Sequence, residues 1–330
     1  MINDTMTSIE GVWIGHAEVP GVASGCTVIL PENGARAGVD IRGGAPGTYG
    51  TDTLNPLNLV ERIHGLFFTG GSAFGMSVAE GVRRFLHERG VGFDSGHGFV
   101  PIVAGAVIFD LALNPQMKYP DAETGYLACR NATRNPVTEG NVGAGAGASV
   151  GKLYGMERAM KGGLGSACIH APTGVKVGAL MVVNAFGDIL DTQSNEIIAG
   201  CRRNEHDLQL IETRKEIHNL VSLRGFPEGQ ATIVGAVATN VRFNKTQLTK
   251  VAQMAHDGLA RAVNPAHTLY DGDTIFALSC GDLDGVEISV VGALAAEVTA
   301  QAIERGVKNA TAFGSLPSFS DLLRKDSRLR

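Results

Sequence analysis

The stretch Ala231-Thr232-Ile233-Val234-Gly235-Ala236-Val237-Ala238-Thr239-Asn240 has the apolar, β-branched character of a buried strand. After it the sequence predicts a helix, a Gly/Asp turn and another strand, which is the pattern of a self-contained segment beginning at Thr232. A threonine in this position can act as a nucleophile whose base is its own α-amino group, provided that the chain is cut before it. The alternative is an ordinary strand threonine that packs its methyl group.

The rest of the chain alternates between strand-like and helix-like segments. Strands are expected over 12–17, 26–30, 101–111 and 177–186, and helices over 73–89, 246–263 and 290–305. Neither a repeat nor a flexible linker separates them, so we expect one compact α/β domain with layered sheets over residues 1–330. The hydrophilic stretch 197–229 ends in a predicted loop at 225–229, which is where a cleavable linker before Thr232 would be needed.

Composition limits the classes of function. The net charge of -5 and the absence of a basic cluster argue against nucleic acid or an anionic membrane as a partner. The start of the sequence has no targeting pattern, and no apolar run reaches the roughly 20 residues of a spanning helix, so a soluble, cytoplasmic protein is expected. The five cysteines are scattered without C-x-x-C spacing, which favours buried free thiols over disulfides or a zinc site.

Three further places carry polar residues that suit amide chemistry. Lys152 follows the glycine-rich run 143–151 and could steer the proton of the nucleophile or hold a carboxylate, although a solvated charge is the alternative. Asn184 interrupts an apolar strand and could donate to an oxyanion, whereas the alternative is a turn-forming residue. Asp271 and Asp273 could position a neighbouring ammonium or hydroxyl group; an isolated Asp-Gly-Asp is otherwise a turn or a weak cation loop.

Five motifs in the same order resemble those of the L-aminopeptidase/D-esterase family, which also contains β-peptidyl aminopeptidases and endo-type nylon-oligomer hydrolases. The motifs are Arg42-Gly43-Gly44-Ala45-Pro46-Gly47-Thr48, Leu66-Phe67-Phe68-Thr69-Gly70-Gly71-Ser72-Ala73-Phe74-Gly75-Met76, Val100-Pro101-Ile102-Val103, Glu139-Gly140-Asn141-Val142-Gly143-Ala144-Gly145 and Tyr270-Asp271-Gly272-Asp273-Thr274. The resemblance extends over roughly residues 11–312. It is specific for the family and much less so for the substrate, because similar members cut different amides.

This resemblance implies a fold and a set of site residues. The fold is an αββα sandwich like that of N-terminal nucleophile hydrolases but differently connected, made from a precursor cut into an α chain (1–231) and a β chain (232–330). The family's nucleophile falls on Thr232, its oxyanion-side asparagine on Asn184, and the lysine of the nylon-oligomer hydrolases on Lys152. The acidic or polar pair near the nucleophile falls on Asp271 and Asp273, and the active-site tyrosine falls on Tyr126. The resemblance also implies a homo-oligomer, a tetramer of αβ units.

The resulting hypothesis is a self-processing amide hydrolase. Thr232 attacks the Ala231 carbonyl, an N-to-O acyl shift and hydrolysis release the new amino terminus, and Thr232 then cleaves a small peptide or peptide-like amide. This chemistry requires no metal and no organic cofactor. Two alternatives remain open: a catalytically silent, uncut binding protein, because Ala231 offers no side chain to orient the cut, and an acyltransferase, because an acyl-enzyme can pass its group to an amine.

Overall fold

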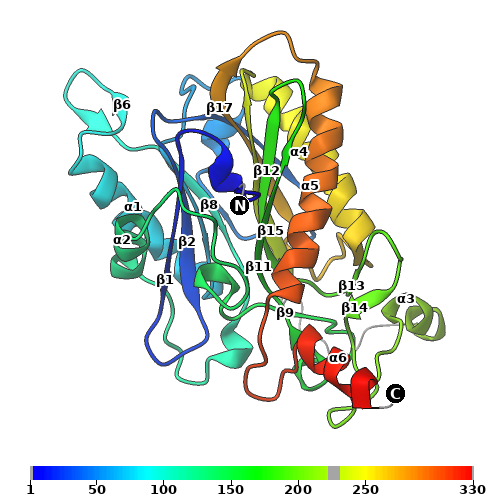
Figure 1. Cartoon of the computed structure of the whole chain (residues 1–330). Coiled ribbons are helices and arrows are strands. Elements are labelled where there is room, and N and C mark those ends of the chain that lie inside the picture. Colours follow the sequence, from blue (N-terminus) through cyan, green and yellow to red (C-terminus); the bar gives the residue numbers. More distant parts are fainter. Residues whose placement is uncertain (1–2, 222–230, 329–330) are drawn as a thin grey trace.

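Two five-stranded sheets pack face to face at the centre of the molecule (Figure 1), in a computed structural model that describes residues 3–221 and 231–328. The first sheet has the order β1 (Val12–Glu18), β2 (Gly25–Pro31), β5 (Gly65–Thr69), β8 (Val103–Val107) and β4 (Thr48–Tyr49). The second has the order β11 (Gly163–His170), β12 (Lys176–Asn184), β15 (Thr232–Val241), β17 (Thr274–Leu283) and β3 (Arg36–Ile41). Both sheets are mixed, because β5 runs parallel to β8 and β15 runs parallel to β17.

Strand β15 is buried on both faces, which explains its continuous apolar sequence. Val234, Ala236 and Ala238 pack into the core between the two sheets, beside Phe68 of β5. The intervening side chains, among them Ile233, point the other way and pack under the helices. Because successive strand residues alternate between faces, Thr232 lies on the same face as Val234 and is directed toward the space between the sheets.

Helices cover the outer face of each sheet, which completes four layers (Figure 1). Helices α1 (Val78–His87) and α2 (Ala122–Arg130) pack on the first sheet, and α4 (Lys245–Ala262) and α5 (Ile288–Lys308) pack on the second. The expected αββα sandwich is confirmed. The remaining α-helices and strands of the described residues are α3 (Thr213–Glu216), α6 (Phe319–Arg328), β6 (Phe93–Asp94), β7 (Phe99–Val100), β9 (Ser149–Val150), β10 (Met160–Lys161), β13 (Asp188–Leu190), β14 (Ile197–Ala199) and β16 (Val263–Asn264).

Two expected elements differ from those observed. The predicted helix over 73–89 begins as a 3₁₀ helix over Ser72–Ser77 and becomes α-helical only from Val78. The predicted strand over 101–111 is reduced to β8, because after Val107 the chain turns out of the sheet and the carboxylate of Asp110 accepts the N–H of Gly71 at 2.7 Å. The predicted loop at 225–229 lies outside the described residues.

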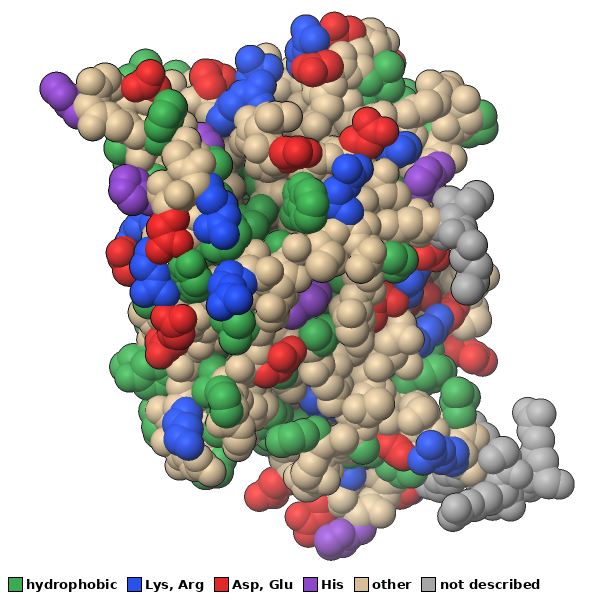
Figure 2. Space-filling view, turned by 60° about the vertical axis from the view of Figure 1, so that its left-hand side comes forward, with side chains coloured by type: hydrophobic (Ala, Val, Ile, Leu, Met, Phe, Trp, Pro, Cys, Tyr) green, Lys and Arg blue, Asp and Glu red, His purple; other side chains and the backbone are tan. Residues whose placement is uncertain are grey.

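The exterior carries charges of both signs. On the face shown in Figure 2, Lys and Arg side chains are interspersed with Asp and Glu rather than gathered by sign. All five cysteines are free thiols, as predicted, and four of them are buried. Within residues 3–221 and 231–328, no helix combines the length and apolar character needed to cross a membrane.

Candidate active site

Thr232 is the first residue of β15 and is 4% exposed. Its partner in the antiparallel ladder is Asn184, the last residue of β12. On its other side, Ala231 bridges to Asp271, just before β17 begins. The start of β15, the start of β17 and the end of β12 therefore meet at one end of the second sheet, and bring four of the predicted site residues to one place.

The carbonyl group of Ala231 is held by two donors. Its oxygen accepts the N–H of Gly272 at 3.1 Å and also the hydroxyl group of Thr232. The N–H of Ala231 donates to the carbonyl of Tyr270 at 3.2 Å, so the backbone on both sides of this residue is fixed by one loop. The methyl group of Ala231 packs in a small apolar cluster with Leu153, Phe186 and Cys201. Backbone bonds therefore provide the orientation that the alanine side chain does not.

Asn184 links the strand end to Lys152. Its side-chain oxygen accepts from Lys152 Nζ at 2.7 Å and from the N–H of Ser149 at 3.1 Å, and its Nδ2 donates to the carbonyl of Phe109 at 3.1 Å. Lys152 Nζ also donates to the Asn184 carbonyl at 3.1 Å. Both side chains are fully buried, so neither a solvated lysine nor an exposed turn asparagine describes them.

Burial changes the protonation of Lys152. Desolvation lowers the pKa of Lys152 to about 7, against the opposing attraction of Asp271 and Asp110. An amine with this pKa is partly neutral near neutral pH, so it can accept a proton as well as donate one. This amine is bonded to Asn184, the ladder partner of Thr232.

Asp271 and Asp273 are buried, and every oxygen of their carboxylates accepts a hydrogen bond. Asp271 accepts from the hydroxyl of Thr268 at 2.6 Å and from the N–H of Phe186 at 3.1 Å. Asp273 accepts from the N–H of Ile233 at 2.9 Å, immediately after the candidate nucleophile. Burial, and then repulsion by Asp273, raise the pKa of Asp271 to about 6. The loop is therefore neither an exposed turn nor a cation loop, because its carboxylates face N–H and O–H groups.

Tyr126 does not lie with the residues around Thr232. It is on α2, where its hydroxyl donates to Glu88 at 2.7 Å and its ring packs edge-on against Phe85. The guanidinium group of Arg84 lies 4.3 Å from the centre of the ring. These contacts belong to the packing of α2 against α1 on the outside of the first sheet, and the structure does not bring Tyr126 to the group around Thr232.

The structure adds charged residues that sequence reasoning missed. Lys161 is fully buried and donates to the carbonyls of Gly145, Ala148 and Gly162 at 3.1, 2.8 and 2.9 Å. Burial lowers the pKa of Lys161 to about 7 and raises the pKa of Asp110. A charged residue near the end of the apolar run 101–111 was the available signal for Asp110. Nothing in the local sequence distinguishes Lys161 from a surface lysine.

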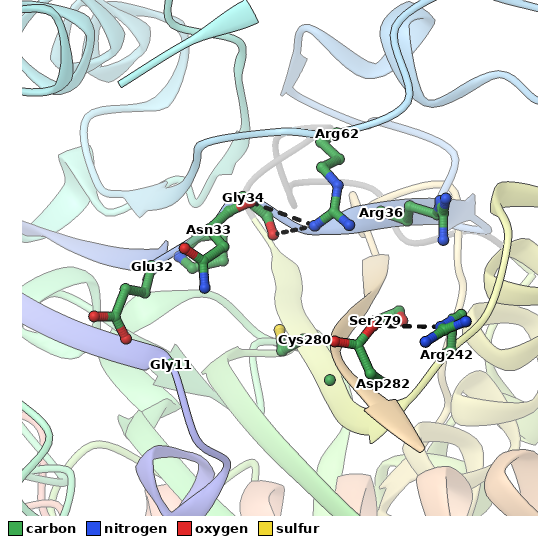
Figure 3. A pocket seen from close by; sticks show the side chains of 12 residues that line it. Gly11, Glu32, Asn33, Gly34, Arg36, Arg62, Arg242, Ser279, Cys280 and Asp282 are labelled. Carbon is green, nitrogen blue, oxygen red and sulfur yellow. Dashed lines mark hydrogen bonds and ion pairs between the residues drawn. The ribbon is translucent and has the colours of Figure 1, made fainter. Parts of the chain in front are cut away.

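A small polar cavity lies at the opposite end of the second sheet (Figure 3). It measures about 120 Å³, and its lining includes Arg36, Arg62, Arg242, Ser279, Cys280 and Asp282. It lies where β15 and β17 end. Because a strand rises ~3.3 Å per residue, the cavity is roughly 30 Å from the first residues of these strands. Two of its arginines have hydrogen-bond partners: Arg242 pairs with Asp282 at 3.3 Å, and Arg62 donates to the carbonyl of Gly34 at 3.0 Å. Arg36 Nε lies 3.5 Å from the carboxylate of Glu61. The cavity shares no residue with the site around Thr232.

Comparisons with known proteins show which family the chain belongs to. A family model described as Peptidase family S58 matches residues 4–316. An uncharacterised aminopeptidase of Mycobacterium bovis is 37% identical over 348 aligned positions, which cover 97% of this chain and 98% of the relative. A 6-aminohexanoate-oligomer endohydrolase of Kocuria sp. is 30% identical over 315 positions, which cover 90% of this chain and 84% of the relative.

Solved structures with the same fold include two aminopeptidases. A β-aminopeptidase of Burkholderia sp. superposes with a TM-score of 0.73 at 22% identity and covers 98% of this chain and 94% of its own. The L-aminopeptidase D-Ala-esterase/amidase of Ochrobactrum anthropi, described as a variant of the Ntn hydrolase fold, gives a TM-score of 0.70 at 20% identity, over 99% of this chain and 95% of its own. From its sequence, and in keeping with this shared fold, the chain belongs to peptidase family S58.

Proposed function

We propose that this protein is an amide hydrolase that cuts itself between Ala231 and Thr232 and then uses Thr232 as an N-terminal nucleophile. The observation that carries the proposal is the arrangement at the scissile carbonyl: the Thr232 hydroxyl lies against the Ala231 oxygen, and the Gly272 N–H donates to that same oxygen at 3.1 Å. A nucleophile and an oxyanion donor on one carbonyl group are what an acyl shift needs.

In the first stage Thr232 Oγ1 attacks the Ala231 carbonyl carbon. Lys152, held on the ladder partner of Thr232, takes the hydroxyl proton, and the Gly272 N–H stabilises the negative charge on the oxygen. The C–N bond then breaks, its nitrogen takes up a proton, and an ester joins Ala231 to the threonine oxygen. Water hydrolyses this ester, which leaves the carboxylate of Ala231 and the free amine of Thr232.

In the second stage the new α-amine acts as the base. Its ordinary pKa of about 7.7 to 8.0 suits proton transfer near neutral pH. It takes the hydroxyl proton while Oγ1 attacks the carbonyl carbon of a substrate amide, and it passes this proton to the substrate nitrogen as the C–N bond breaks and the amine leaves. Water then hydrolyses the remaining ester, which releases the acid and restores the Thr232 hydroxyl. Aminopeptidases and a nylon-oligomer hydrolase among the relatives support small peptides or peptide-like amides as the substrate class.

Mass spectrometry of freshly purified protein tests the first stage, and a panel of L-amino-acid amides, short peptides, β-peptides and aminohexanoate oligomers tests the second. We expect two fragments that meet between Ala231 and Thr232, together with hydrolysis of at least one amide. A chain that stays intact and inactive would instead identify a silent protein of this fold. Transfer of the acyl group to an added amine in preference to water would identify an acyltransferase.

Gly272→Ala is expected to slow the self-cleavage at least about tenfold. A Cβ at this position would lie 2.6 Å from the Ala45 carbonyl oxygen and 2.9 Å from Thr232 Oγ1, so the loop and the hydroxyl would have to separate. Overpacking of this kind also costs about 1–3 kcal/mol of stability. The measurement is the time course of fragment appearance on a denaturing gel. Gly65→Ala, whose Cβ would meet only side chains, is the control and should cleave at the normal rate.

We also propose that the cut chains assemble as a homo-oligomer, a tetramer of αβ units. Strand β15 of the second segment lies between β12 and β17, so separation of the halves would expose core surface at about 25 cal/mol per Å². Association between units would help to hold the halves together. Light scattering at low micromolar concentration is expected to give a multiple of 34.5 kDa. A mass near 34.5 kDa with full activity would rule this assembly out.

A further inference from the structure

The loop from His267 to Asp273 holds the backbone on both sides of Thr232. On one side the N–H of Gly272 donates to the Ala231 carbonyl at 3.1 Å. On the other, Asp273 Oδ1 accepts the N–H of Ile233 at 2.9 Å. The peptide planes before and after the candidate nucleophile are therefore both bonded to this one loop, so a shift of the loop would move the hydroxyl group between them.

His267 holds the second oxygen of the Asp273 carboxylate. Asp273 Oδ2 accepts the backbone N–H of His267 at 3.0 Å and lies 2.8 Å from the ring Nδ1 of the same residue. We assign the hydrogen of this pair to Nδ1, because an imidazole N–H donates and a carboxylate oxygen accepts. One oxygen of Asp273 is thus fixed by His267 and the other by Ile233, and the carboxylate is only 1% exposed.

The backbone and the ring of His267 are both constrained. Its φ angle is +57°, in the left-handed region that is uncommon for residues other than glycine. Its ring packs edge-to-face on that of His256, with centroids 4.8 Å apart. His256 is itself buried and bonds through Nε2 to the Asp40 carbonyl at 3.0 Å. The ring of His256 therefore packs against the imidazole of His267, and this imidazole bonds to Asp273.

We infer that His267 is a positioning residue for the nucleophile: its imidazole N–H fixes the Asp273 carboxylate, and this carboxylate fixes the amide that follows Thr232. The inference rests on the proposed function. Without the ring, Asp273 Oδ2 keeps only the backbone N–H of His267, so the carboxylate is held less firmly in the orientation that accepts the N–H of Ile233. A displacement of about 1 Å at a reacting group can cost about 10²-fold in rate.

Two substitutions separate the hydrogen bond from the backbone conformation. His267→Gly and His267→Asn both tolerate a positive φ angle, but only asparagine places an N–H donor near the position of Nδ1. We expect His267→Gly to reduce both the rate of self-cleavage and kcat for an amide substrate about 10²-fold, with KM changed less than about threefold. His267→Asn should stay within about tenfold of the unsubstituted protein, and added imidazole should restore part of the activity of His267→Gly.

The outcomes separate this inference from the proposed function. If the unsubstituted protein neither cuts itself nor hydrolyses an amide, the proposed function fails and the role of His267 fails with it. If that protein is active and His267→Gly only lowers the melting temperature, with activity per folded molecule unchanged, the His267 inference alone is overturned. Nitrogen-15 NMR of the histidine rings gives a further check, because His267 should show a protonated Nδ1 whose signal shifts in Asp273→Asn. An unprotonated Nδ1 would also overturn the His267 inference.

Discussion

Thr232→Ala is expected to yield a folded, uncut chain that has lost at least about 10⁴-fold of its amide hydrolysis, the scale of removing a catalytic nucleophile. The hydroxyl removed is the one that lies against the Ala231 carbonyl. The substitution keeps the buried strand and removes few atoms, so the free energy of unfolding should change by only about 1 kcal/mol. Mass spectrometry and the amide panel measure the loss, and thermal melting measures the stability.

Two controls accompany this variant. Thr232→Ser keeps a hydroxyl and should still be cut. Thr239→Ala removes a buried threonine from the other end of the same strand, where the hydroxyl donates to the Lys176 carbonyl at 2.9 Å, and should be cut normally even if it melts earlier. Amide hydrolysis by Thr232→Ala at the rate of the unsubstituted protein would remove Thr232 from the mechanism.

Lys152→Met is expected to slow self-cleavage about 10²- to 10⁴-fold, the usual contribution of a general base. Methionine fills a similar volume but cannot accept the hydroxyl proton. In the unsubstituted protein the pKa of Lys152 is lowered to about 7, so its neutral form increases through pH 7. The cleavage rate should therefore rise from about pH 6 to pH 8 and then level off. In Lys152→Met this rise should be absent.

The same lysine predicts how stability depends on pH. The folded protein releases the Lys152 proton near pH 7, because burial lowers its pKa to about 7, whereas an unfolded lysine keeps its proton until about pH 10.4. Between these values the unfolded state binds more protons, so stability increases with pH. The melting temperature of the unsubstituted protein should therefore rise relative to that of Lys152→Met between pH 7 and pH 10.

An exposed lysine provides the control for both measurements. The Lys215 side chain is 68% exposed and pairs with Glu212 on the surface. Lys215→Met should change neither the pH dependence of cleavage nor that of stability. Cleavage by Lys152→Met at the normal rate and with the normal pH profile would show that another group takes the hydroxyl proton.

Tyr126 illustrates where a local motif stops being informative. The segment Glu123-Thr124-Gly125-Tyr126 forms the first turns of α2, and Gly125 lets this helix approach α1, because a Cβ there would lie 2.3 Å from the Val78 carbonyl oxygen. The direction of the tyrosine ring is set by this helix contact and by the carboxylate of Glu88. Neither partner is near Tyr126 in sequence, so the motif could not indicate which way the ring points.

The sequence by itself determined the alternation of strands and helices, the family and the candidate nucleophile, because these depend on local periodicity and on ordered motifs. The burial of Lys152 against Asn184, the support of Ala231 by Gly272 and the pairing of His267 with Asp273 were decided only by the tertiary structure. A pKa and a hydrogen bond depend on solvent exclusion and on neighbouring atoms. Those neighbours come from strand ends that are distant in the chain and meet only when the sheets are packed.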